Sequence, residues 1–109
     1  MMNEALQVSV SAPSRELADR LARTAVEARL AACAQVSGPV HSSYHWRGQV
    51  ERAEEWLCLL KTTRARYAAL EQHLRAGHSY DNPEIVAVAI AAGSEAFLRW
   101  LRAETTPPA

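Results

Sequence analysis

Residues 56–60 read WLCLL and residues 85–90 read IVAVAI, and both runs are apolar at odd and at even positions. Successive side chains of a β-strand point to opposite faces of a sheet, so these runs predict strands that are buried on both faces. Between them, residues 64–76 place apolar side chains at helical spacing, and Gly77 is a natural helix stop. A strand, a helix and another doubly apolar strand therefore form the second half of the predicted fold.

The first half begins with a strand and a helix of its own. Residues 6–12 alternate apolar and polar side chains, the pattern of a half-buried strand. Pro13 breaks this strand, and Ser14 can cap a helix whose apolar spacing continues to about Leu30. We therefore expect a strand followed by a helix that packs on it.

A long hairpin is expected to link the two halves. Residues 40–46 and 50–62 have the extended, β-branched and aromatic character of strands, and the Arg-Gly-Gln segment at 47–49 separates them. Pro39 cannot donate a hydrogen bond to a sheet, so it marks a bend or an edge. The third strand of the fold therefore ends in the doubly apolar run at 56–60.

These elements predict the fold class α+β, with a βαββαβ order in a ferredoxin-like sandwich and an extra C-terminal helix around Phe97–Leu101. The 109 residues fit one domain, with its core at about 6–102 and no repeat or linker that would divide it. Two main helices cover only one face of such a sheet. We therefore expect the second apolar face to meet other copies of the same chain.

Composition excludes some function classes. Lys plus Arg number 12 and Asp plus Glu number 12, so no long-range field attracts nucleic acid or an anionic membrane. RNA-recognition domains share the βαββαβ order, but their third strand is basic and aromatic, whereas residues 50–57 here are acidic. The N-terminus has no secretion-signal pattern and no apolar run approaches the ~20 residues of a membrane span, so a cytoplasmic location is expected.

The residues with metal or catalytic potential have no familiar spacing. On a strand, His41 and His45 would lie ~13 Å apart, too far to share one ion. Cys33 and Cys58 lie in apolar runs without a zinc-site pattern and are interpreted as buried thiols, although a disulfide between them stays open. No nucleophile motif or glycine-rich phosphate loop is present, so we expect a protein that is not an enzyme.

Polar and aromatic side chains gather near the predicted strand ends, at 44–46, at 61–62 and at 78–84. Aromatic rings with polar edges, a lysine and a carboxylate can line a small wet pocket. The alternative interpretation is a set of ordinary loop residues, with Glu84 paired to Lys61. The pattern alone does not decide between them.

Five ordered motifs between about Val8 and Leu101 resemble the CutA family of divalent-cation tolerance proteins. They are SAP at 11–13, RLAAC at 29–33, YHWRGQVE at 44–51 with Glu55 and Lys61-Thr62 after it, HSYDNPEI at 78–85, and FLRWL at 97–101. Ser79 and Asp81 depart from the proline and glutamate usual in the family, and Val10 replaces a cysteine that some members carry. That last change argues against thiolate-based copper binding.

The resemblance implies a homotrimer whose sheets face one another and a role in the response to copper and other divalent cations. Our main hypothesis adds a cleft between subunits, lined by Trp46, Lys61, His78, Tyr80 and Glu84, that binds a small ligand or a divalent ion. No cofactor is required, and Cu(II) or another divalent cation would bind weakly through His78 and Glu84, a nitrogen and an oxygen donor. The alternative is a metal-independent structural or signalling trimer that docks a protein partner.

Overall fold

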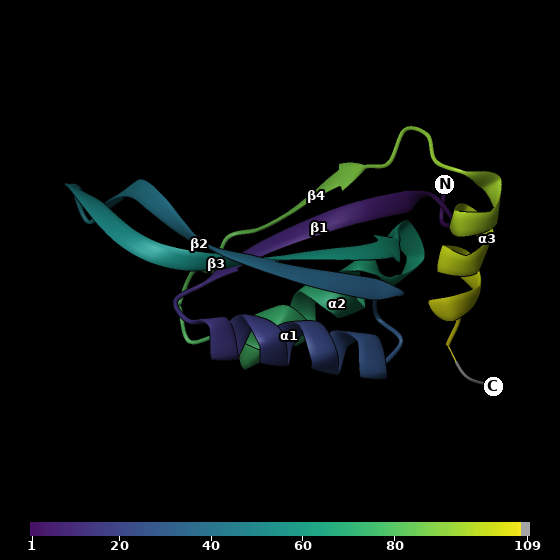
Figure 1. Cartoon of the computed structure of the whole chain (residues 1–109), viewed down its shortest axis with the longest axis horizontal. Coiled ribbons are helices and arrows are strands. Elements are labelled where there is room, and N and C mark those ends of the chain that lie inside the picture. Colours follow the sequence, from purple (N-terminus) through teal and green to yellow (C-terminus); the bar gives the residue numbers. More distant parts are fainter. Residues whose placement is uncertain (108–109) are drawn as a thin grey trace.

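The computed structural model describes residues 1–107 and has the predicted α+β architecture (Figure 1). Its four strands form one antiparallel sheet in the order β2-β3-β1-β4. The elements in chain order are β1 (Ala5–Ala12), α1 (Arg15–Glu27), β2 (Cys33–Trp46), β3 (Gln49–Thr63), α2 (Arg64–Gly77), β4 (Ile85–Ala89) and α3 (Glu95–Glu104). The predicted order of elements is confirmed.

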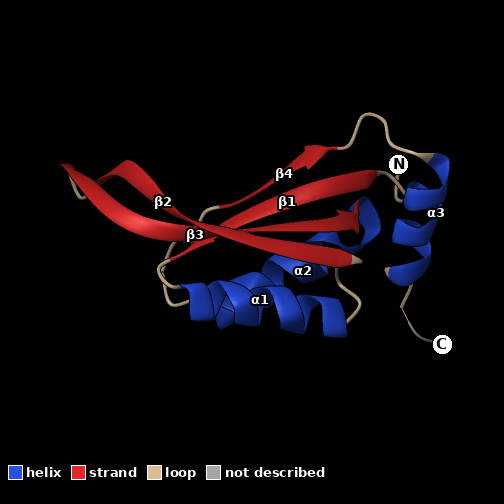
Figure 2. Cartoon of the chain, viewed as in Figure 1, coloured by secondary structure: helices blue, strands red, loops and turns tan. Residues whose placement is uncertain are grey.

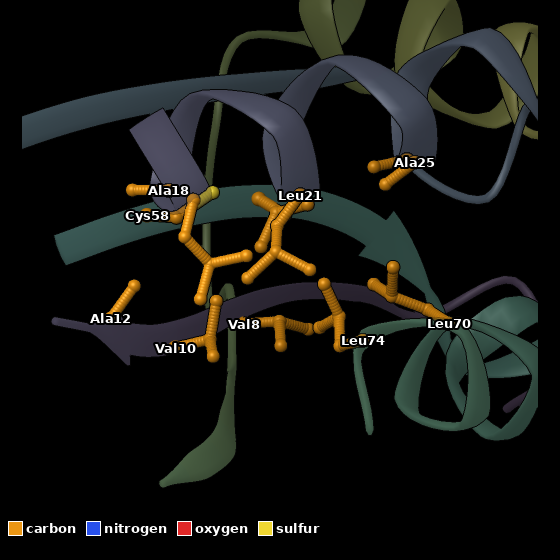
Figure 3. Packing of buried hydrophobic residues seen from close by; sticks show 12 residues of the cluster. Val8, Val10, Ala12, Ala18, Leu21, Ala25, Cys58, Leu70 and Leu74 are labelled. Atoms are coloured by element: carbon orange, nitrogen blue, oxygen red, sulfur yellow. The ribbon is translucent and has the colours of Figure 1, made fainter. Parts of the chain in front are cut away.

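Helices α1 and α2 pack together on one face of the sheet, and Figure 2 shows both below the strands. The apolar side chains that β1 and β3 contribute to the centre of this face are buried, and they meet leucines of both helices (Figure 3). The principal members are Val8, Val10, Cys58, Leu60, Leu17, Leu21, Leu70 and Leu74. Ser14 caps α1 as predicted, because its hydroxyl accepts a hydrogen bond from the Leu17 N–H at 3.1 Å. We call this the covered face.

The opposite side of the sheet, which we call the open face, has no helix on it in residues 1–107 (Figure 2). Ser9 pairs with Leu59 on one side and Val86 on the other, which places all three side chains on this face. Val86 and Val88 are 48% and 59% exposed, and Leu57 and Leu59 are half-buried. The predicted shortage of cover for a second apolar face is therefore present in the single chain.

Helix α3 packs at the far end of the sheet rather than on either face (Figure 1). Leu101 is fully buried there against Ala5 and Ala32, in a small cluster separate from the main core. The helix begins at Ser94, whose side chain accepts from the Phe97 N–H. No helix of the described chain is long and apolar enough to span a membrane.

Strands β2 and β3 continue beyond β1 as a two-stranded arm, residues 40–55 (Figure 1). The pairing of β1 with β3 ends at Ala12 and Trp56, so beyond that point the two arm strands pair only with each other. Arg47 and Gly48 close the hairpin with φ of 52° and 79°, the left-handed values of a tight two-residue turn. The arm contributes to the molecule's 45 Å long axis.

Two predicted boundaries are wrong. Helix α1 ends at Glu27 rather than near Leu30, because Arg29 adopts a left-handed φ of 60°. Strand β2 begins at Cys33 rather than at residue 40, and the Gly38-Pro39 bend lies within it as a shift in register. Gly38 is required there, since a Cβ would lie 2.7 Å from Trp56 Cδ1.

Candidate functional site

A cleft of about 700 Å³ opens between the arm and the loop that joins α2 to β4. Residues 42–46 of β2 and Glu55 of β3 form one wall, residues 79–84 form another, and Ser11 lies at the end of β1. Glu55 has the same parity as Leu57 and Leu59 in the continuous strand β3, so its side chain leaves on the open side of the sheet. The cleft is therefore continuous with the open face.

The loop at 78–84 has a conformation that its sequence explains. Helix α2 ends at Gly77, and His78 follows in an extended conformation that cannot continue the helix. Pro83 favours an extended Asn82 and carries the chain directly into β4. The loop is thus short and constrained, and it holds Tyr80 beside the arm.

Tyr80 and Glu55 form the central contact of the cleft. The Tyr80 hydroxyl donates a 2.9 Å hydrogen bond to Glu55 Oε2, and Glu55 is only 6% exposed. Burial, followed by the hydrogen bond to Glu55 and its charge, raises the pKa of Tyr80 to about 12. The phenol therefore keeps its proton and remains a donor to the carboxylate across the physiological range.

His78 supports the loop from behind. One ring nitrogen, Nδ1, accepts from the Tyr80 N–H at 3.1 Å, so the neutral ring donates from Nε2 to the Ser11 carbonyl at 2.7 Å. The two rings of His78 and Tyr80 also stack at a tilt, with centroids 4.9 Å apart. His78 therefore ties the loop to β1 and sets the position of Tyr80.

The structure brings three of the five predicted cleft residues together in one chain: Trp46, Tyr80 and Glu84 all line the cleft. His78 lies behind it, and Lys61 lies on the open face, paired in the sheet with Gln7 and Cys33. Since the predicted cleft was between subunits, the contribution of Lys61 stays a prediction. The pairing of Glu84 with Lys61, which belonged to the alternative interpretation of ordinary loop residues, is not among the ion pairs of the described chain.

Sequence reasoning missed Glu55 and Ser11 as members of the site. Both are polar side chains that are almost fully buried, at 6% and 5% exposed. Glu55 lies two residues before Leu57, on the same side of the strand, but Glu54 stands in the same relation to Trp56. The local pattern therefore did not distinguish Glu55 from the exposed Glu54.

The residues present fit a tightly held resident metal poorly. In the described chain no three His, Cys, Asp or Glu side chains are placed to hold one ion. Both nitrogens of His78 are occupied by hydrogen bonds, so a metal would have to displace the Ser11 carbonyl or the Tyr80 N–H. His41 and His45 are exposed on the arm. Cys33 and Cys58 are both free thiols; Cys58 is buried as interpreted from the sequence, whereas Cys33 is half-buried.

The fold and the cleft define a class: a ferredoxin-like α+β protein with a ligand-sized cleft at the margin of an uncovered sheet face. A family model described as CutA1 divalent ion tolerance protein matches residues 6–104. The chain belongs to this CutA1 family, as the sequence motifs indicated.

Relatives and solved structures agree with this membership. The chain is 42% identical over 98 residues to the divalent-cation tolerance protein CutA of Thermus thermophilus, covering 90% of this chain and 95% of that protein. It is 38% identical to the chloroplastic protein CutA of Arabidopsis thaliana, again over 90% of this chain, but it spans only 54% of the length of that relative. A solved structure of the divalent cation tolerance protein from Thermus thermophilus superposes with a TM-score of 0.92 at 40% identity, covering 94% of this chain and 99% of that one.

Proposed function

We propose that this chain acts as a homotrimer in tolerance of divalent cations, copper among them, without catalysing a reaction. Its cleft is completed between subunits and binds a small ligand or, weakly, a divalent ion. The observation that carries the proposal is the continuity of the cleft with an open sheet face that presents Leu57, Leu59, Val86 and Val88. The surface that joins two chains would then also form part of the wall of the cleft.

The open face supplies the driving force for assembly. Burying the exposed parts of Val86 and Val88 and the half-buried Leu57 and Leu59 would contribute roughly 1 kcal/mol or more for each side chain. These side chains come from β3 and β4, with Ser9 of β1 between Leu59 and Val86, so contact with another sheet could cover them together. Because dissociation would expose this surface again, thermal stability is expected to rise with protein concentration.

Divalent-ion binding through His78 and Glu84 is the less favoured part of the proposal. Imidazole nitrogen and carboxylate oxygen suit Cu(II), but two donors are sparse, and His78 would first lose a hydrogen bond. We therefore expect weak binding, because the site is not preformed and His78 must rearrange when the ion binds. We also propose a cytoplasmic location, as expected from the sequence.

The alternative function is a metal-independent structural or signalling trimer that docks a protein partner. The projecting arm favours it, because Tyr44, Trp46 and Val50 are 41%, 41% and 66% exposed there. Aromatic side chains on an accessible element are common anchors in protein interfaces. Capture of the same partner with and without chelator would favour this function, and capture that needs the ion would exclude it.

Native mass spectrometry of the purified protein, alone and with a small excess of Cu(II), tests both the assembly and the ion. The expected result is a trimer that takes up one ion per subunit, with uptake reduced in Glu84→Ala and retained in the control Glu54→Ala. A trimer that takes up no specific ion would favour binding of a small ligand or of a protein partner instead. A monomer at micromolar concentration would overturn the proposal.

A further inference from the structure

The cleft is lined by acids and aromatic rings, and no Lys or Arg of the described chain lines it. Its carboxylates are Glu55, Asp81 and Glu84, and its rings include those of Tyr44, Trp46 and Tyr80. None of the three carboxylates takes part in an ion pair within residues 1–107. The chain as a whole carries equal numbers of acidic and basic side chains, so this local excess of negative charge is specific to the cleft.

Glu55 shows where an opposite charge would bind. Its Oε2 is occupied by the Tyr80 hydroxyl, while its Oε1 has no hydrogen-bond partner in the described chain. No fully buried side-chain oxygen of that chain lacks a partner, so Oε1 retains access to the cleft that Glu55 lines. A buried carboxylate with one oxygen turned to a cavity is a strong acceptor for a charged donor.

The aromatic rings favour a cation with an organic body. A cation is attracted to the face of a tryptophan or tyrosine ring, and apolar groups pack against the same rings. The protein already makes one such contact at the rim, where the Arg47 guanidinium lies 5.4 Å from the centre of the Trp46 ring. An anion would meet three carboxylates, with Arg47 at the rim and His45 in the lining as the basic side chains nearby, and a metal ion would find no group of three ligands.

We propose that the cleft binds a primary ammonium group on an apolar stem, with Glu55 Oε1 as its charged acceptor and the ring of Tyr80, whose hydroxyl bonds the same carboxylate, against its stem. This inference rests on the proposed function, since it names the ligand class of the same cleft. The ammonium comes either from a free alkyl amine or from a lysine of a second copy. Lys61 is the only lysine of the chain, and it lies on the open face without an acidic partner in the described residues.

The test is a titration of the intact protein with n-butylammonium, which reproduces a lysine side chain, against its neutral analogue n-butanol. The indole N–H signal of Trp46, assigned with a Trp46→Phe variant, reports binding by NMR. Glu55→Gln keeps an acceptor for Tyr80 but removes the charge, and loss of a charged hydrogen bond should weaken binding about tenfold or more. Glu54→Gln is the matched control, because the adjacent Glu54 is exposed and does not line the cleft.

Two results would support the inference and distinguish the sources. Binding to the wild type that n-butanol does not reproduce, weakened by Glu55→Gln and unchanged by Glu54→Gln, indicates a free amine. Binding that appears only in Lys61→Ala, and is again lost on adding Glu55→Gln, indicates that Lys61 of another copy fills the cleft in the wild type.

Three results would overturn it: no binding in any variant, equal binding of n-butanol, or equal effects of the two glutamine substitutions. Native mass spectrometry of the same samples separates this outcome from failure of the proposed function. A trimer that does not bind the amine would contradict only the proposed ligand class. A monomer removes the trimeric function whether or not the amine binds.

Discussion

The covered and open faces of the sheet are made by the same strands, yet they differ in what completes them. Leu59 and Leu60 are neighbours in β3, and one is half-buried on the open face while the other is fully buried under the helices. The centre of the covered face is buried within one chain, although Ala87 and Ala89 of β4 are exposed at its edge. The open face is as apolar along β4 but has nothing on it in the described chain, so it is a surface adapted to a contact outside the chain.

The position of the cleft follows from this difference. Its buried members, Glu55 and Ser11, leave β3 and β1 on the open side, where no helix fills the space. A cleft of this size could not form on the covered face, because apolar side chains from both helices occupy it. Substitutions on the open face are therefore expected to alter function, and substitutions on the covered face are expected to alter stability.

The largest effect is expected for Leu60→Ala on the covered face. Removing this fully buried side chain leaves a cavity and should lower the free energy of unfolding by about 2–5 kcal/mol. The matched substitution Leu59→Ala should cost less, and its cost should vary with protein concentration. Denaturant unfolding at two concentrations measures both, and equal, concentration-independent losses would contradict the distinction between the faces.

A smaller effect on folding but a clear effect on assembly is expected for Val88→Asp. The side chain is 59% exposed in the single chain, so the charge costs the isolated fold little. When the open face is packed against another chain, the same change loses about 1.5–3 kcal/mol of burial free energy per chain and leaves a charge without a partner. Sedimentation should show a shift from trimer to monomer. Val26→Asp on the outer surface of α1 is the control, and dissociation of both variants alike would break the comparison.

The smallest effect, when expressed per pH unit, is a decline of stability at alkaline pH that belongs to the covered face. Burial, with a lesser contribution from Asp19, raises the pKa of Cys58 from 9.0 to about 12. Between these values the unfolded chain loses the thiol proton while the folded chain keeps it, so unfolding becomes easier as pH rises. The expected slope is roughly 1 kcal/mol per pH unit.

Tyr80, whose pKa is raised from 10.0 to about 12, adds to the same decline from about pH 10 upward. Urea unfolding at pH 8, 9, 10 and 11 would measure the slope. Cys58→Val should flatten it between pH 9 and 10, where Tyr80 does not yet contribute. An unchanged slope in that variant would show that the thiol is not its source.

Much of the fold could be predicted because it rests on local patterns. Alternation along residues 6–12 and helical spacing in 64–76 each depend on near neighbours in the chain, and both elements are present. The bend at Pro39 was also predicted, but not its place inside a longer strand. Whether Gly38 and Pro39 interrupt the pairing or are absorbed by a register shift depends on Trp56 across the sheet.

The candidate site was predictable only in part. Its aromatic and acidic residues could be singled out by type, and Trp46, Tyr80 and Glu84 do meet. Glu55 was no more conspicuous than its neighbour Glu54. Lys61 was grouped with the cleft by its chemistry, yet within one chain it lies on the open face beside Gln7 and Cys33.

By itself, the sequence determined the order of the elements, the two apolar faces of the sheet and membership of the CutA1 family. These properties are carried by residue periodicity and by short motifs, which need no knowledge of distant contacts. Only the tertiary structure decided that Tyr80 bonds Glu55, 25 residues away, and that His78 bonds Ser11, 67 residues away. Such contacts depend on strand register and on the path of the arm and loop, which are set when the whole chain packs.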